Sequence, residues 1–560
     1  MVDFEILIKP AYVVNLTPED HTVTEIVTTY GDLGYVQAKP KFIPKPVLVS
    51  PELSPLPNHH ENPQNCIQMF VDEIMPGCSW FDNRFHEALF QQDPLYINCY
   101  NFKVGFPQLC EKKFDFLSPS LRTACPAAFD ESQKLILKTF NERNGGVPEI
   151  EGRVPYDLLA DEMIAAFKRN CVSDTELLNF YTQNLMSINV DSITEWITMQ
   201  APEVLKIIKA SEIEHIKFSR LNYYYYMLKR LAKPSLEPHP ERKFASPQAI
   251  AYQDKVVNAY ISPVVRDMKQ RMYSVMRKDK IVSSDMSVAD FQEILNHRFP
   301  PSLMKDYPHR IEIDISKFDK SQGLLALLID VKMMELFGVP EEMITLWFCM
   351  HITTRLVNLP QKFSAWVHYQ RKSGDPMTFL GNTLFLIVSL CYLLGDDFKD
   401  MFGLFAGDDS YLFSKKLLDL SDLTNRAAVE LNLEMKLLHF NYPYFCSKFL
   451  IPVDHGDWMV VPDMWKAIIK LGRSDLVNYE HVEQYRVSLI DNFKALEFGQ
   501  YHYQYAVALA ERYKMKYIPI DVFSAVHSLL KSKKKFADLY YIASGDVIDT
   551  ERYRLPSVEI

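Results

Sequence analysis

Residues 404–413 read Leu404-Phe405-Ala406-Gly407-Asp408-Asp409-Ser410-Tyr411-Leu412-Phe413, which is two apolar runs joined by Gly-Asp-Asp. Glycine and aspartate are common turn residues, and apolar runs on both sides of such a turn are typical of a β-hairpin. The pattern therefore predicts a hairpin with two adjacent carboxylates at its tip. Carboxylate oxygens are the ligands that hard divalent cations prefer, so this tip is a candidate metal site. On its own, an ordinary surface turn is the commoner interpretation.

Further carboxylates lie upstream, at the end of an alternating stretch. Residues 310–315 read Arg-Ile-Glu-Ile-Asp-Ile, an alternating strand that ends at Asp314, and Asp319 follows five residues after Asp314. Because strand side chains alternate between faces, we expect three buried isoleucines on one face and Glu312 with Asp314 on the other. A strand that ends in a carboxylate beside a hairpin tipped with carboxylates is the arrangement that two Mg²⁺ ions about 3.5–4 Å apart require for phosphoryl transfer. The two segments together favour such a site.

A polar loop separates these segments in the chain. It reads Ser-Gly-Asp-Pro-Met-Thr from residue 373 to residue 378, and a long apolar stretch that carries Asn382 follows it. Ser373, Thr378 and Asn382 can offer two hydroxyls and an amide to a sugar, and Gly374 allows the chain to approach a ligand closely. The start of a buried helix is the alternative for this loop alone. The order of carboxylate strand, polar loop and carboxylate hairpin favours the functional interpretation.

In this order the segments resemble the RNA-dependent RNA polymerases of positive-strand RNA viruses, in particular the alphavirus-like superfamily that includes tobamovirus-type replicases. Residues 314–322 are similar to motif A of that family, residues 373–382 to motif B, and residues 407–409 to motif C. Lys436 falls where motif D has its lysine, and residues 444–449 are similar to motif E. The resemblance implies template-directed RNA synthesis that replicates and transcribes a viral genome by two-metal nucleotidyl transfer.

The resemblance also implies roles for individual residues. Asp314, Asp408 and Asp409 would hold two Mg²⁺ ions, for which Mn²⁺ can substitute. Asp319 and Asn382 would read the 2′-hydroxyl of the incoming nucleotide, the group that distinguishes RNA from DNA substrates. Lys436 is a candidate general acid for departure of pyrophosphate. A solvated lysine on an amphipathic segment is an equally good interpretation of the same residue.

A locally basic segment is similar to motif F, whose residues contact the triphosphate. Its cations are Lys229, Arg230, Lys233, Arg242 and Lys243. Lysine binds phosphate as a point charge and arginine as a bidentate fork. We take Lys229 and Lys233 as candidate nucleotide ligands, together with the polar residues of motifs A and B named above. For any single one of these cations, a surface position is the commoner explanation.

The resemblance implies an α+β fold, shaped as a right hand of fingers, palm and thumb. Its palm would be ferredoxin-like and its thumb mainly helical, as the apolar stripe that begins at Val482 also indicates. The expected boundaries are an N-terminal segment with a proline-rich linker at 1–64, an N-terminal extension with fingers at 65–309, palm at 310–330, fingers at 331–372, palm at 373–455 and thumb at 456–560.

Composition agrees with an intracellular nucleic-acid enzyme. The chain has 560 residues and a formal net charge of −10, so a polymerase of this sequence needs a basic channel inside an acidic exterior. Its nine cysteines include no Cys-x-x-Cys pair, which indicates a reducing compartment and no zinc site. The longest apolar stretch, 379–395, is short for a membrane span, so we expect no transmembrane segment.

Partners and location are implied by the resemblance alone. They are an RNA template and product, nucleoside triphosphates, and viral helicase and capping replicase proteins, in the host cytoplasm at membrane-associated replication complexes. Two other functions stay open at this point. One is a different two-metal enzyme such as a reverse transcriptase, which would prefer deoxynucleotides. The other is a non-catalytic scaffold or RNA-binding subunit, which has no need of clustered, mutually repelling carboxylates.

Overall fold

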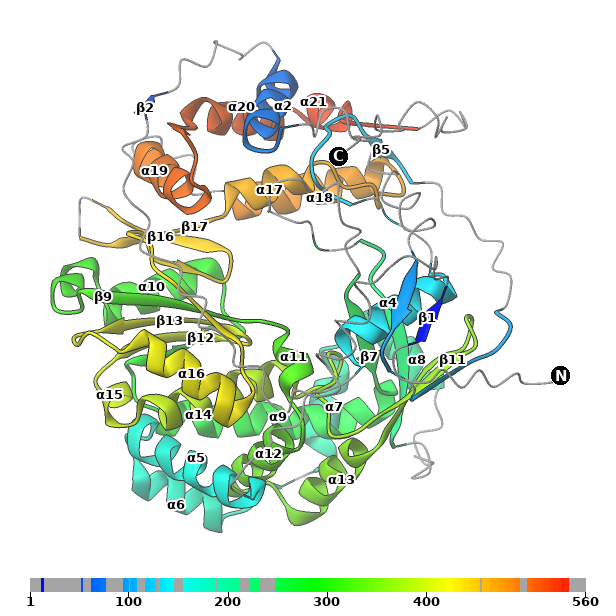
Figure 1. The fold of residues 1–560 in the computed structure, drawn as a ribbon, viewed down its shortest axis with the longest axis vertical. Helices are drawn as coiled ribbons and strands as arrows, with labels where there is room; N and C mark the ends of the chain where they lie inside the picture. The colour runs from blue at the N-terminus through cyan, green and yellow to red at the C-terminus, as the bar shows by residue number, and fades with distance from the viewer. Residues whose placement is uncertain are drawn as a thin grey trace.

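The computed structural model describes residues 12–14, 52–53, 62–76, 94–99, 101–107, 116–126, 128, 131–145, 155–187, 189–210, 221–231, 233, 247–453, 456–493 and 501–542. Figure 1 shows their helices and strands arranged as an incomplete ring. One sheet lies on the left of this view, a second on the right, and the C-terminal helices lie across the top. The fold therefore mixes helices with sheets, as the predicted α+β class requires.

The sheet on the left carries the predicted carboxylates. Its strand order is β14-β9-β13-β12-β8, with bounds Met435–Leu438, His309–Ile315, Asp409–Ser414, Phe402–Ala406 and Lys280–Val282. β12 and β13 form the predicted antiparallel hairpin, in which Ala406 pairs with Asp409. Gly407 in its turn has φ = 63°, a left-handed conformation that favours glycine. The hairpin and its acidic tip are thus confirmed.

The predicted alternation of β9 is confirmed as well. Ile311, Ile313 and Ile315 are buried, whereas Asp314 on the opposite face is exposed. The isoleucines belong to a large core whose helices cover this face, namely α14 at Thr378–Leu394 and α16 at Leu420–Leu431. Helix α14 is the apolar stretch that the sequence indicated as a buried helix. None of the described helices has the length and apolar character needed to span a bilayer.

The other face of this sheet is covered over part of its length. Leu404 and Phe413 share a core with Trp458 of β17 (Trp458–Pro462), Leu450 of β16 (Lys448–Pro452) and helix α10 (Val288–Arg298). The carboxylates lie beyond this cover, at the end of the sheet where β9 stops and β13 begins.

Helix α14 packs against two further helices, α5 and α12. α5 spans Tyr156–Cys171 and α12 spans Leu324–Leu336, and α5 packs against both α12 and α14. Helix α12 ends at Leu336, and Gly338 just after it has φ = 74°, a left-handed conformation that favours glycine. A Cβ at Gly338 would lie 2.2 Å from the carbonyl oxygen of Tyr181, so this position has no room for another residue.

The sheet on the right has the order β4-β11-β10-β6-β7. Its strands span Phe102–Val104, Phe363–Val367, Thr354–Asn358, Tyr223–Leu228 and Ala249–Tyr252. β6 contains the four successive tyrosines, and Tyr224 and Tyr226 are buried while Tyr223 and Tyr225 are half-buried on the other face. Aromatic packing of one strand face therefore explains this tract.

The third region joins the beginning and the end of the described chain. Helix α2 (Pro63–Ile74) packs against α20 (Ile520–Lys531), and both share a core with α17 (Met464–Lys470). The apolar stripe predicted from Val482 lies on α18 (Tyr479–Asn492), and a separate helix, α19 (His502–Tyr513), follows. The sequence analysis assigned residues from 65 onward to an N-terminal extension with fingers. The helix at the start of that range, α2, lies beside the C-terminal helices.

The other described elements connect these three regions. They are β1 Tyr12–Val14, β2 Glu52–Leu53, β3 Leu95–Ile97, β5 Ser118–Pro119, α4 Gln133–Arg143, α6 Thr175–Gln183, α7 Val190–Thr198, α8 Pro202–Ala210, α9 Lys255–Val275, the 3₁₀ helix Pro301–Lys305, α11 Phe318–Ser321, α13 Glu341–Ile352, α15 Asp396–Lys399, β15 Tyr444–Phe445, β18 Tyr517–Ile518, α21 Lys533–Ala537 and β19 Tyr540–Tyr541. Most of the proline-rich stretch lies outside the described residues, so its predicted role as a linker stays a prediction.

Candidate active site

Helix α14 holds the acidic hairpin tip in place. The backbone N–H of Gly407 donates a hydrogen bond to Oγ1 of Thr383 at 2.9 Å, and Thr383 is buried in α14. Asp408 and Asp409 follow directly and are exposed. Residues just after the polar loop therefore set the position of the carboxylates, although only the carboxylates were predicted from the sequence. The one feature of the sequence that could have indicated this contact is a threonine within a long apolar helix.

The negative charges of the carboxylates at the tip are not balanced by nearby cations of the described residues. Partial desolvation raises the pKa of Asp408 above its ordinary value, and the negative charges of Asp409 and Asp319 raise it further. Lys233 opposes this effect but does not cancel it. Although the Asp408 side chain is open to solvent, the surrounding protein is close enough to weaken its hydration. A cation bound here would relieve the repulsion among these carboxylates.

Asp314 reaches the same end of the sheet from β9. The antiparallel ladder pairs Ser410 with Ile313, so Asp409 and Asp314 each lie one residue further toward the same end. Lys436 of β14 lies opposite Asp314 in the register, and its Nζ is 3.7 Å from Oδ2 of Asp314. The Asp314 side chain is 52% exposed, so this ion pair is accessible to solvent. Lys436 is thus close to a predicted metal ligand, on a strand beside it.

A second hairpin contacts the tip, and the sequence did not predict it as part of the site. The turn between β15 and β16 contains Cys446 and Ser447, with φ values of 50° and 59°. The thiol of Cys446 lies near Asp409, and burial together with this negative charge raises the pKa of Cys446. Lys466 of α17 donates a hydrogen bond to Oγ of Ser447 at 2.9 Å. The motif E segment therefore supports Asp409 from the side of the C-terminal helices.

The two predicted sugar-reading residues do contact each other. Nδ2 of Asn382 donates a hydrogen bond to Oδ1 of Asp319 at 2.8 Å. Asp319 lies in the short helix α11 and is exposed, whereas Asn382 lies in α14 and is buried. Since the charge of Asp319 also raises the pKa of Asp408, this pair lies near the hairpin tip.

Ser373 and Thr378 are engaged in holding their own loop. Oγ of Ser373 donates to the carbonyl oxygen of Ala249 at 3.0 Å, and Oγ1 of Thr378 donates to that of Lys372 at 2.5 Å. A Cβ at Gly374 would lie 2.6 Å from the carbonyl oxygen of Ala251, so the close approach that this glycine allows is to strand β7. These contacts match the structural alternative for the loop. Nucleotide binding through the same hydroxyls stays a prediction.

The two candidate lysines of the basic segment differ in position. Nζ of Lys229 donates to Oε1 of Gln248 at 2.8 Å, beside strand β7. Lys233 instead acts electrostatically on both Asp408 and Lys466, which brings it to the carboxylates. Arg242 and Lys243 lie outside the described residues. Of the two, Lys233 is the one that the structure places beside the hairpin tip.

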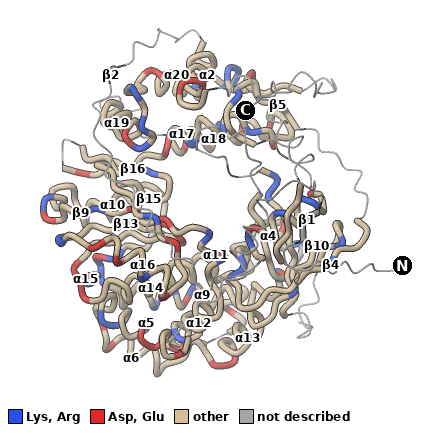
Figure 2. The backbone as a smooth tube through the Cα atoms, in the orientation of Figure 1, with Lys and Arg blue, Asp and Glu red and all other residues tan. Residues whose placement is uncertain are grey.

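Lysine and arginine are distributed unevenly around the ring. Figure 2 shows basic segments beside α11 and on the facing side of the ring, and acidic segments at the ends of the strands of the first sheet. This pattern agrees with positive charge on the inner side of an acidic protein. A channel that binds RNA stays a prediction.

A buried lysine lies directly before the polar loop. Lys372 is buried, and its Nζ has no hydrogen-bond partner among the residues that the structure describes. This Nζ lies 5.6 Å from the ring centroid of Tyr224. Desolvation lowers the pKa of Lys372 to about 7, because the charge of Asp375 offsets only part of the effect and Arg371 adds to it. Asp375 is itself held by Nε2 of His351, with Oδ2 at 2.9 Å.

We expect Lys372 to make the protein more stable as the pH rises above about 7. In the unfolded chain Lys372 keeps its proton up to about pH 10.5, whereas the folded chain releases it near 7. The unfolded state therefore binds one proton more within this window, and stability increases by up to about 1.4 kcal/mol per pH unit. Below the window the folded state carries the full cost of a buried charge. Thermal unfolding between pH 6.5 and 9.5 measures the slope.

The matched variants for this measurement are Lys372→Met and Lys399→Met, the second at an exposed lysine of α15. We expect the slope to become shallower in Lys372→Met and to stay unchanged in Lys399→Met. Equal slopes in the wild-type protein and Lys372→Met would contradict the assignment of this titration to Lys372.

The side chains at the tip provide carboxylate oxygens, which are the type of ligand that a hard divalent cation binds. Among the residues that the structure describes, no three His, Cys, Asp or Glu side chains lie close enough together to hold one metal ion. Asp408 and Asp409 nevertheless provide adjacent carboxylates, and partial desolvation together with the charges of Asp409 and Asp319 raises the pKa of Asp408. Carboxylates are the ligands of Mg²⁺ and Mn²⁺ rather than of softer metals. By charge and donor type, the residues fit the predicted ions.

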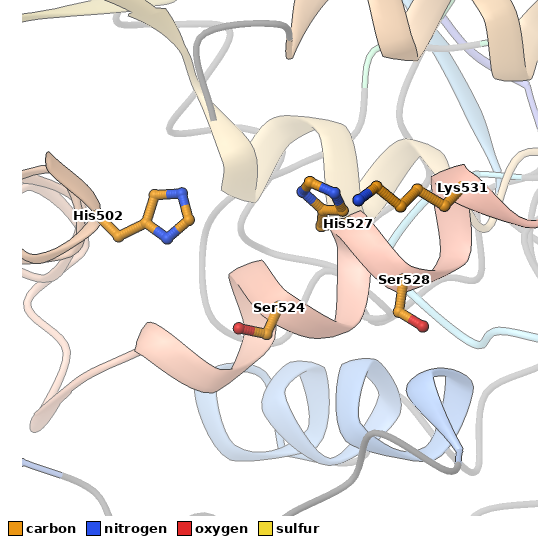
Figure 3. Close-up of a pocket in the computed structure, with 5 residues that line it drawn as sticks. All are labelled: His502, Ser524, His527, Ser528 and Lys531. Atoms are coloured by element: carbon orange, nitrogen blue, oxygen red, sulfur yellow. The ribbon is translucent and has the colours of Figure 1, made fainter. Parts of the chain in front are cut away.

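A pocket of about 330 Å³ lies elsewhere, among the C-terminal helices. Figure 3 shows that His502 of α19 faces it from one side and Ser524, His527, Ser528 and Lys531 of α20 from the other. None of the predicted site residues lines this pocket. The candidate active site is therefore the end of the first sheet, where carboxylates from β9, α11 and the β12–β13 hairpin gather.

Comparison with known proteins gives separate information on the family of the chain. A family model described as RNA dependent RNA polymerase matches residues 101–539. An RNA replication protein of Citrus leprosis virus C is 31% identical over 431 residues, which are 76% of this chain and 16% of that protein. The replicase large subunit of Turnip vein-clearing virus is 27% identical over 483 residues, which are 85% of this chain and 29% of that protein. The chain thus spans less than a third of the length of these relatives.

Proposed function

The chain belongs to the RNA-dependent RNA polymerase family, and from this premise we propose that it extends an RNA strand on an RNA template by nucleotidyl transfer. The observation that carries the proposal is the gathering of Asp314, Asp408 and Asp409 at one end of a sheet, beside the hydrogen-bonded pair Asp319 and Asn382. Carboxylates for metal ions and a polar pair for a sugar are the two elements that the reaction requires.

In this proposal Asp314, Asp408 and Asp409 hold two Mg²⁺ ions, for which Mn²⁺ can substitute. When bound, such ions activate the attacking 3′-hydroxyl and stabilise the leaving pyrophosphate. The protein holds the three carboxylates at the tip and at the strand end. Thr383 supports Asp408 through Gly407, and Cys446 lies near Asp409. Lys233, which already acts on Asp408, is placed to meet a triphosphate.

Asp319 and Asn382 select the ribose. A 2′-hydroxyl can donate a hydrogen bond to a carboxylate and accept one from an amide N–H, so the pair complements a ribonucleotide. Ser373, Thr378 and Lys229 are the further candidate contacts to the nucleotide. We propose Lys436 as the general acid, because its ammonium group lies 3.7 Å from Asp314 and so borders the metal site.

The right-hand architecture is part of the proposal. The sheet with β9, β12 and β13 would be the ferredoxin-like palm, the sheet with β6 and β10 would belong to the fingers, and helices α17–α21 would form the thumb. The close packing of α2 against α20 suggests that α2 belongs with the thumb rather than with the fingers.

Partners and location follow the relatives. One of the reported relatives is named a replicase large subunit, and both are much longer than this chain. We therefore propose that helicase and capping activities come from other replicase segments or proteins. We further propose that the protein works in the host cytoplasm, at membrane-associated replication complexes.

A primer-extension assay tests the proposed reaction. The purified chain is given a primed RNA template with Mg²⁺ or Mn²⁺ and either ribonucleoside or deoxynucleoside triphosphates. We expect incorporation of ribonucleotides and its loss on chelation of the metal. A preference for deoxynucleotides would point to a reverse transcriptase. A chain that is inert with both metals would point to a scaffold that retains the polymerase shape.

A further inference from the structure

A chain of buried hydrogen bonds ends at the predicted sugar-reading pair. Oδ1 of Asn382 accepts from Nε2 of Gln322 at 2.9 Å, and Oε1 of Gln322 accepts from Nε of Arg371 at 3.0 Å. Arg371 in turn donates to both carboxylate oxygens of Asp330, at 2.5 and 3.0 Å. We call the residues Asp330, Arg371 and Gln322 the relay. It connects α12, the loop before α14 and the end of α11.

The relay is closed to water and leaves no room for rearrangement. The side chains of Arg371 and Asp330 are 3% and 2% exposed, and Gln322 is buried as well. A Cβ at Gly381 would lie 2.5 Å from Nη1 of Arg371, so the guanidinium lies flat against this glycine of α14. An acid within the apolar helix α12 was the sequence signal for such a buried partner.

The chemistry of Arg371 sets the direction of every hydrogen bond in the relay. A guanidinium can only donate, so the Gln322 atom that faces it must be the carbonyl oxygen. The amide nitrogen of Gln322 then faces Asn382 and requires the carbonyl oxygen of Asn382. The amide nitrogen of Asn382 consequently faces Asp319. In an isolated Asn–Asp pair only the exposed carboxylate would favour this orientation of the amide, whereas here the buried cation fixes it from the other side as well.

We infer that Asp330, Arg371 and Gln322 are positioning residues that fix the Asn382 amide with its N–H groups toward the sugar, and that they thereby determine selectivity for ribose over 2′-deoxyribose. The inference rests on the proposed function and deepens it. An Asn382 side chain turned over would present its carbonyl oxygen next to the Asp319 carboxylate. Two acceptors would then face a 2′-hydroxyl that can donate to only one of them.

Gln322→Glu tests this inference with almost no change in shape. A glutamate can accept from Arg371 but cannot donate to Asn382, so the Asn382 amide should turn over. We expect kcat/KM for ATP to fall at least tenfold while kcat/KM for 2′-dATP changes little. The reason is that the site binds a 2′-hydroxyl through the Asn382 amide N–H, and it no longer favours ribose when that N–H is misplaced. A purely structural role would lower both values by the same factor.

Gln370→Glu is the matched control. Gln370 is also buried and lies one residue before Arg371, but it hydrogen bonds with Asn144 and is outside the relay. We expect the ratio of the two kcat/KM values to stay at the wild-type level in this variant. An unchanged ratio in Gln322→Glu, or an equal change in both variants, would overturn the inference.

An equilibrium measurement separates this inference from the proposed function. If wild-type protein incorporates no nucleotide, the proposed function fails. The affinities of ATP and 2′-dATP for the protein with a primed template then decide the inference by themselves. It stands if Gln322→Glu lowers the preference for ATP, and it fails if the wild-type protein shows no preference or the variant keeps it.

Discussion

Asp408→Asn is expected to abolish RNA synthesis and to leave the fold intact. Asparagine keeps the shape of the side chain at the hairpin tip but removes the negative charge that a metal ion requires. Loss of that charge should lower kcat by at least about 10³-fold, which corresponds to roughly 4 kcal/mol of transition-state stabilisation. Single-nucleotide incorporation on a primed template with Mg²⁺ measures the effect.

Stability should not fall with activity in this variant. Because desolvation, Asp409 and Asp319 raise the pKa of Asp408, its ionised form is less favourable in the folded protein than in the unfolded chain. A neutral side chain removes this repulsion, so the midpoint of thermal unfolding should stay equal or rise. Asp400→Asn, at an exposed carboxylate after α15, is the matched control and should keep full activity. Activity above about a tenth of wild type in Asp408→Asn would refute the catalytic role.

The second large effect is expected at a contact between β9 and the C-terminal helices. Arg512 of α19 donates to both carboxylate oxygens of Glu312 at 2.8 Å, and both side chains are 14% exposed. Its guanidinium also lies 3.3 Å from the ring centroid of Tyr444. Arg512→Met leaves the nearly buried carboxylate of Glu312 without its partner. The free energy of unfolding should fall by about 3–5 kcal/mol. At roughly 2–4 °C per kcal/mol, the thermal midpoint should fall by several degrees.

Two further variants make this measurement specific. Lys416→Met breaks an ion pair with Asp397 whose side chains are 67% and 45% exposed, and the thermal midpoint should stay almost unchanged because solvent screens such a pair. The double variant Glu312→Leu with Arg512→Met removes both charges and should recover much of the loss. If Arg512→Met were no less stable than Lys416→Met, the pair would not hold β9 to the C-terminal helices.

Local patterns in the sequence predicted the elements of the site. Alternating isoleucines predicted the buried face of β9, and Gly-Asp-Asp between apolar runs predicted the β12–β13 hairpin. The apolar stretch after the polar loop predicted α14, and the pairing of Asp319 with Asn382 followed from the resemblance. Burial periodicity and turn chemistry are properties of neighbouring residues, so a single sequence reveals them.

Contacts between distant segments were not predictable in this way. The sequence favoured hydroxyls of the polar loop that face a ligand, but Ser373 and Thr378 bind backbone carbonyl groups in the structure. It left the surroundings of Lys436 open, and only the register of β14 against β9 placed this lysine opposite Asp314. Cys446 gave no signal of its own as a neighbour of Asp409.

The sequence by itself determined which carboxylates stand at the strand end and the hairpin tip, because side-chain alternation and turn geometry act over a few residues. The tertiary structure alone decided what surrounds them, including Arg512 on Glu312 and Arg371 on Asp330. The physical reason is that a buried charge needs a partner, but its partner is chosen by the packing of helices and strands that lie far apart in the chain.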